Sequence, residues 1–213
     1  MNIKFFNVAL GIALTATTLS ASAQKTYTSG LMTITTGMNG QDIDAKAYFT
    51  PDSSSMSFTA GPASIKILKD TKNSYMAICI DVPVASIKKA AIAKPAEIEE
   101  MMSDFPKFTF TPTTEAKQIS GFNCKKVVAT DAKGTKYDIW ITNDVLLGPG
   151  AIAPYYEKIG GTPIQFMSFS QGQSAAVTVK SITDEKAPAG TFAVASDFEK
   201  ITMDDLKAMR GGQ

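Results

Sequence analysis

The chain has 213 residues, with 21 basic and 20 acidic side chains, and it contains no histidine. A nearly balanced charge with a single arginine, Arg210, argues against nucleic acid as a partner, because phosphate binding needs a concentrated basic surface. The lack of histidine excludes histidine-based catalytic triads and removes the commonest ligand of transition metals, so we expect neither a metal nor another cofactor.

Residues 1–23 have the features of a secretory signal peptide. Lys4 precedes a short apolar stretch, Phe5–Leu14, and the small residues Ala21–Ala23 form a cleavage site. The apolar stretch is shorter than the roughly 20 residues of a membrane span, so we expect cleavage and no transmembrane anchor afterwards. No cysteine stands at the cleavage site, which argues against a lipoprotein. The sequence therefore predicts a periplasmic or secreted protein.

The remaining residues, 24–213, have a length typical of one domain. Over 43–49, 56–60 and 76–80, apolar residues alternate with polar ones, which is the pattern of antiparallel strands with one face in water. The turn residues between such runs are rich in glycine, which accepts positive φ at no steric cost. We expect about ten strands, a number compatible with one large sheet.

Helical periodicity interrupts the strands once in the middle of the chain. A weak helical pattern over 84–93 precedes a clearer one that begins at Pro95. One face of this second helix carries Ile98, Met101, Met102 and Phe105. Glutamates occupy the other face, so the helix is expected to cover something apolar.

The second half of the chain returns to strands and ends in a helix. Alternation predicts strands at 108–111 and 136–142, and the long connection over 143–161 contains a short helix near 154–159. Phe166 and Met167 place apolar side chains on both faces of one strand, as in a strand that is buried on two sides. Thr202 and Asp205 form a capping pattern for a last helix, which Gly211 ends.

Two cysteines, Cys79 and Cys124, each lie in an apolar stretch that resembles a strand. Export permits a disulfide between them, which would stabilise the fold by about 4 kcal/mol. The alternative is that both are small buried hydrophobic residues. No nucleophile, base and orienting group occur at a recognisable spacing, so we expect a protein that is not an enzyme.

A sheet whose helices are gathered in insertions and at one end belongs to the α+β class. Three stretches, Ile119–Lys126, Tyr137–Thr142 and Phe192–Phe198, together with the helix Met203–Met209, resemble a family of secreted bacterial proteins of unknown function. That family is related to the lipoprotein-carrier-like half-barrels typified by LolA and LppX. The resemblance implies one LolA-like domain over 24–213, in which a curved, unclosed antiparallel sheet has helices packed across its concave face.

Relatives of that fold hold acyl chains in the concave cavity, so the resemblance implies a lipid-like or other hydrophobic ligand. The methionines support this hypothesis, because their flexible, polarizable side chains suit irregular ligands. The cavity lining that we predict consists of Ile98, Met101, Met102, Phe105, Phe166 and Met167. The alternative is a structural or interaction protein of the cell envelope, with a core filled by its own side chains and a protein as its partner.

Overall fold

The computed structural model describes residues 24–38, 40–170 and 172–211, so the predicted signal peptide at 1–23 lies outside the described residues. Twelve described strands form one sheet, and two more form a small parallel pair. The large sheet contains β2 (Gly30–Met38), β3 (Gln41–Phe49), β4 (Ser53–Ala60), β5 (Ala63–Asp70), β6 (Met76–Val82), β7 (Ile87–Ile92), β8 (Thr109–Ile119), β9 (Phe122–Thr130), β10 (Lys136–Thr142), β12 (Thr162–Ser170), β13 (Gln173–Thr183) and β14 (Glu199–Thr202). The small pair is β1 (Lys25–Tyr27) with β11 (Val145–Leu147), and the helices are α1 (Pro95–Ser103) and α2 (Met203–Gly211).

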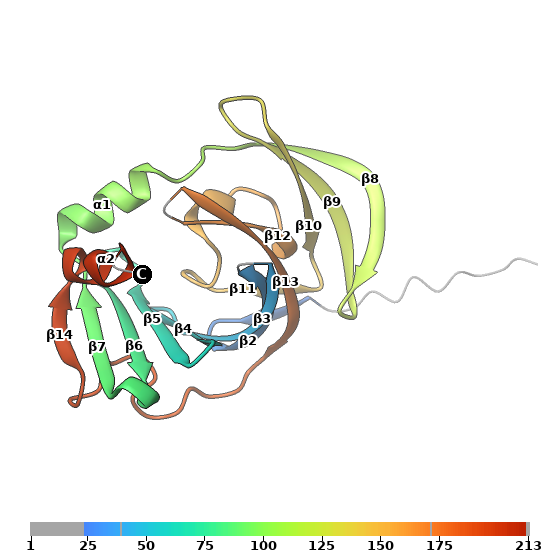
Figure 1. Cartoon of the computed structure of the whole chain (residues 1–213). Helices are drawn as coiled ribbons and strands as arrows, with labels where there is room; N and C mark the ends of the chain where they lie inside the picture. Colours follow the sequence, from blue (N-terminus) through green and yellow to red (C-terminus); the bar gives the residue numbers. More distant parts are fainter. Residues whose placement is uncertain (1–23, 39, 171, 212–213) are drawn as a thin grey trace, which may run out of the picture.

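The large sheet is strongly curved and stays open. Its strand order is β14-β7-β6-β5-β4-β3-β2-β13-β12-β10-β9-β8, and every neighbouring pair is antiparallel except β14 with β7. The curve brings the two ends of the sheet round toward the same side without pairing them (Figure 1). The prediction of a curved, unclosed antiparallel sheet is therefore confirmed. We call β5, β6, β7 and β14 the near limb, and β8, β9, β10 and β12 the far limb.

Alternation along the strands gives the sheet an apolar concave face. Because neighbouring strands pair in register, apolar side chains form two rows across the sheet. One row is Ile34, Ala45, Phe58, Ile65 and Ile80. The other row is Met32, Ala47, Met56, Ile67 and Ile78.

Both helices form where the sequence predicts them. In α1, Pro95 occupies the first turn and the Glu97 carboxylate accepts the backbone N–H of Lys94 at 2.6 Å. In α2, the Asp205 carboxylate accepts the Thr202 N–H at 2.9 Å, and the Asp205 N–H donates to the Thr202 hydroxyl at 3.1 Å. This reciprocal pair is a capping box.

The helices cover only part of the concave face. Apolar residues of α1 and α2 pack with Ile78 and Ala91 of the near limb in one cluster. Figure 1 shows both helices against this limb, whereas helices across the whole concave face were expected. On the far limb, the connection 148–161 lies against the inner face instead, and its short predicted helix is a 3₁₀ turn, η2 (Pro154–Tyr156).

The weak helical pattern over 84–93 was misleading. The chain forms a 3₁₀ turn, η1 (Pro83–Ala85), and then strand β7. Ala90 and Ala91 are both buried, one in a cluster with Leu68 and the other beneath the helices. Strand β7 thus has both faces covered, and its pairing with the distant β14 cannot be seen in local periodicity.

Candidate functional site

The centre of the concave face is apolar and only half-buried. We call this surface the concave strip; it consists of Met32, Ala47, Met56, Phe58, Ile65, Ile67 and Ile80. These side chains come from five neighbouring strands, β2 to β6, and they are contiguous because the strands pair in register. Contiguous exposed apolar surface on a protein often marks a binding site.

Helices α1 and α2 form one wall beside the concave strip. Ile98 of α1 is only 5 % exposed and belongs to the core between α1 and the sheet. Met101 and Met102 pack on the same core but are partly exposed. Ile65 and Ile80 of the concave strip also pack against this cluster, so the wall and the strip are continuous.

The connection 148–161 forms the opposite wall. Tyr156 is 1 % exposed, and its hydroxyl donates to the backbone carbonyl of Met167 at 2.7 Å. Burial raises the pKa of the Tyr156 phenol. The ring of Phe166 packs edge-on to Tyr156, with centroids 5.6 Å apart. Beneath this wall, next to Met32, a hollow of about 30 Å³ remains.

The two walls meet through an aromatic contact. Phe105, which follows α1, packs edge-on to Tyr155 of the connection with ring centroids 5.1 Å apart. The Tyr155 hydroxyl accepts the backbone N–H of Phe169 at 3.0 Å, which fixes this wall to β12. In Figure 1 the chain after α1 runs across from the near limb to the far limb. The concave strip therefore has walls on two sides that are joined at one point.

Only some of the residues predicted to line a cavity lie in the walls beside the concave strip. Met101, Met102, Phe105 and Phe166 belong to the walls, whereas Ile98 lies in the core behind one of them. Met167 follows Phe166 in β12 but belongs to neither of the clusters that form the walls. Sequence reasoning missed the concave strip itself, although the alternation in 43–49 and 56–60 contained the signal.

The two cysteines are free thiols in separate places. Cys79 packs with Leu68 and Ala90 on the outer face of the near limb. Cys124 belongs to the cluster around Ile164. Burial raises the pKa of both thiols. The disulfide that the sequence allowed is not formed, and both residues are buried hydrophobic residues.

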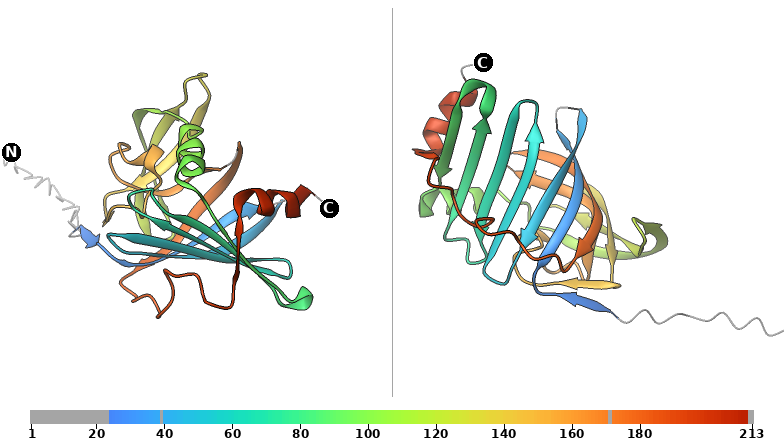
Figure 2. Two further views of the ribbon diagram at one scale, coloured as in Figure 1. Left: turned by 90° about the vertical axis from the view of Figure 1, so that its left-hand side faces the viewer. Right: turned by 90° about the horizontal axis from the view of Figure 1, so that it is seen from below.

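The outer face of the sheet carries a polar hollow. Residues 184–198, which we call the strap, cross the outer face between β13 and β14 (Figure 2). The Lys66 ammonium donates to the carbonyl of Ala193 at 2.8 Å, and Tyr48 donates to Glu185 at 2.7 Å. A hollow of about 1050 Å³ borders the strap, and its lining mixes lysines with aspartates. This mixture does not specify one ligand chemistry.

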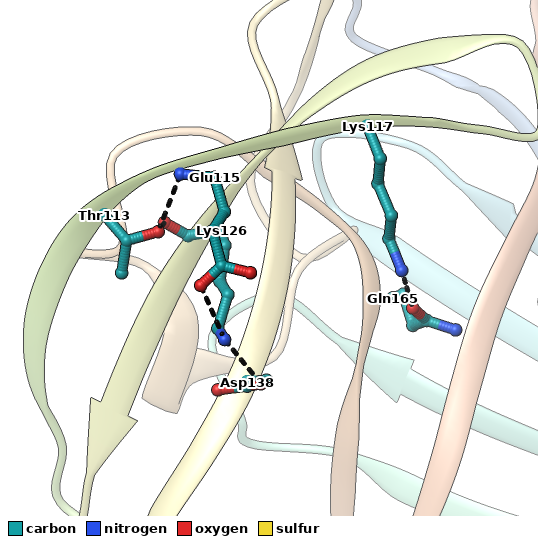
Figure 3. Close-up of polar contacts among 6 residues, drawn as sticks. All are labelled: Thr113, Glu115, Lys117, Lys126, Asp138 and Gln165. Atoms are coloured by element: carbon teal, nitrogen blue, oxygen red, sulfur yellow. Dashed lines mark hydrogen bonds and ion pairs between the residues drawn. The ribbon is translucent and has the colours of Figure 1, made fainter.

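Ion pairs fasten the outer face of the far limb. The Lys126 ammonium lies 2.8 Å from Asp138 and 2.9 Å from Glu115, and these contacts, that with Asp138 foremost, raise its pKa (Figure 3). The Thr113 hydroxyl donates to the Lys126 carbonyl and accepts the Glu115 N–H, at 3.1 and 3.2 Å. These bonds satisfy the backbone where β8 bulges between Pro112 and Ala116. Their role is structural.

Fold and site together define a half-open antiparallel barrel with an apolar inner surface. The model of one family, described as a domain of unknown function (DUF4412), matches residues 28–149. The chain belongs to this family. No curated protein matches it. Within the described residues, no helix is long and apolar enough to cross a membrane.

Solved structures with a similar fold are distant. PNGF-II is 17 % identical with a TM-score of 0.49, and the match covers 85 % of this chain but 32 % of that one. MucB is 11 % identical with a TM-score of 0.44, over 82 % of this chain and 60 % of MucB. The structure of MucB in complex with MucA(peri) has a TM-score of 0.45 and is also 11 % identical, and the match covers 82 % of this chain and 57 % of that one. The chain thus spans less than two thirds of either protein, and at these scores the likeness carries no argument about function.

Proposed function

We propose that this protein is an exported, non-enzymatic binding protein whose ligand is an acyl chain held on the concave strip. The observation that carries the proposal is the half-exposed apolar surface on the inside of the sheet, with walls on two sides. A flat apolar surface would favour another protein, whereas a concave one with flanking walls suits a narrow, flexible chain. Met32 and Met56 within the strip adapt to such a chain.

The relation to LolA-type and LppX-type carriers, and the periplasmic location, are part of this proposal. The alternative is an envelope protein whose partner is another protein. The way in which Tyr156 and Phe166 fill the inner side of the far limb agrees with a partly self-filled core. The two functions differ in whether the protein takes up a free lipid.

A charge placed in the concave strip separates the two functions. Ile67 is half-exposed and lies between Met56 and Ile78 in register, so Ile67→Glu puts a carboxylate where the chain would lie. We expect uptake of a dansyl-labelled fatty acid, measured by fluorescence titration, to weaken by about tenfold or more, since a carboxylate is costly to bury in an apolar contact.

The matched control is Ser64→Glu, on the same strand but on the outer face and exposed. We expect this variant to bind as the wild type does. Circular dichroism establishes that both variants are folded. Equal binding by a folded Ile67→Glu variant, or no uptake by the wild type, would refute the proposal and favour a protein partner.

A further inference from the structure

One charged side chain of the concave face lies next to the apolar inner rows. Along β5, Ile65, Ile67 and Lys69 share the concave face because strand side chains alternate. Lys69 pairs in register with Ser54 of β4 and with Met76 of β6. Met76 packs in the cluster beneath the helices, which places Lys69 beside the wall formed by α1.

The surroundings of this lysine differ from those of Lys126. Two carboxylates contact Lys126 on the outer face, whereas no carboxylate of residues 24–38, 40–170 and 172–211 forms an ion pair with Lys69. The side chain of Lys69 is exposed. Nevertheless, desolvation by the surrounding protein lowers the pKa of its ammonium.

We propose that the Lys69 ammonium binds the carboxylate of a fatty acid whose chain lies along the concave strip. This inference rests on the proposed function and names the ligand class. The distance fits, because the four residue-to-residue steps from Lys69 to Ile65 span about 13 Å of strand. The ligand's polar end would lie where β4 begins and β5 ends, and its tail would contact Ile67 and then Ile65.

The charge of the site selects a monoanion. Lys69 offers one compact positive charge, and a carboxylate neutralises it with a charge-assisted hydrogen bond. A dianionic phosphate would leave one charge uncompensated beside the apolar concave strip, which is unfavourable. Phosphate recognition also favours the forked donors of arginine, and the only arginine of this chain is Arg210 in α2.

Two ligands of equal chain length test the inference. Dodecanoate carries the carboxylate, and methyl dodecanoate has the same chain without the charge. Isothermal titration of the wild-type protein is expected to give tighter binding of dodecanoate. Lys69→Met keeps most of the aliphatic length and removes the charge, so dodecanoate binding is expected to weaken by about tenfold while ester binding is unchanged. Lys69→Arg keeps the charge and is expected to retain the preference.

The outcomes separate this inference from the function on which it rests. Binding of both ligands by the wild type, with no loss of dodecanoate affinity in Lys69→Met, would overturn the role of Lys69 and leave the acyl-chain site standing. Binding of neither ligand by the wild type would overturn both. Lys66→Met, on the outer face of the same strand, is the matched control and is expected to behave as the wild type.

Discussion

Removing a single hydroxyl group from Tyr156 tests whether the connection 148–161 is a fixed wall. The hydroxyl donates to the Met167 carbonyl at 2.7 Å, and the side chain is 1 % exposed. Tyr156→Phe keeps the ring and its contacts with Phe108, Phe110 and Phe166, whose centroids lie 5.8, 6.5 and 5.6 Å away. The substitution therefore removes one hydrogen bond and leaves the packing intact.

The size of the effect follows from that bond. One hydrogen bond contributes about 1 kcal/mol to the free energy of unfolding. Where its loss leaves a buried carbonyl without a partner, the loss of stability can reach about 3 kcal/mol. We expect Tyr156→Phe to lower the free energy of unfolding by about 1–2 kcal/mol. For a domain of this size, each kcal/mol corresponds to about 2–4 °C in the melting temperature. Tyr156→Ala also removes the ring and is expected to cost about 3–5 kcal/mol.

Urea unfolding followed by circular dichroism measures these differences. The matched control is Tyr137→Phe, because the Tyr137 ring packs on Phe108 and Phe169 and its hydroxyl has no hydrogen-bond partner among the described residues. We expect the control to stay within about 0.5 kcal/mol of the wild type. If Tyr156→Phe were as stable as the control, the wall would not depend on this bond and our reasoning about it would be wrong.

Two further predictions concern packing and the thiols. A Cβ atom at Gly30 would collide with the carbonyl oxygen of Thr183, whereas a Cβ atom at Gly37 would meet no atom within 4 Å. Gly30→Ala is therefore expected to destabilise the fold by about 1–3 kcal/mol, and the control Gly37→Ala is not. Equal melting temperatures of the two variants would contradict this prediction. Cys79 and Cys124 are expected to react slowly with a thiol reagent in the native protein, because both thiols are buried. After unfolding without a reductant, the protein is expected to bind two labels. An unfolded protein that binds no label would show that the two cysteines are not free thiols.

Local patterns in the sequence predicted the elements whose partners are near in the chain. The helix after Pro95 and the capping box of Thr202 and Asp205 depend on residues three or four positions apart, and both formed as expected. Strand β7 was missed because its burial depends on β14, more than a hundred residues away. The free cysteines were undecided for the same reason, since their separation depends on the curvature of the whole sheet.

The candidate site was predicted in part. The helical period of α1 correctly placed Met101 and Met102 on the inward face, but it did not show that Ile98 would be core. The floor of the site needs the register of five strands, which no single segment contains. Lys69 could have been noticed from alternation with Ile65 and Ile67, yet only the assembled sheet places it beside apolar neighbours.

Native mass spectrometry tests most directly whether the concave strip holds an acyl chain. The protein is purified without detergent, and half of the sample is extracted with organic solvent before measurement. We expect a reproducible additional mass in the untreated sample that is lost on extraction and recovered as a fatty acid. A bare polypeptide mass in both samples, unchanged after incubation with dodecanoate, would contradict the account.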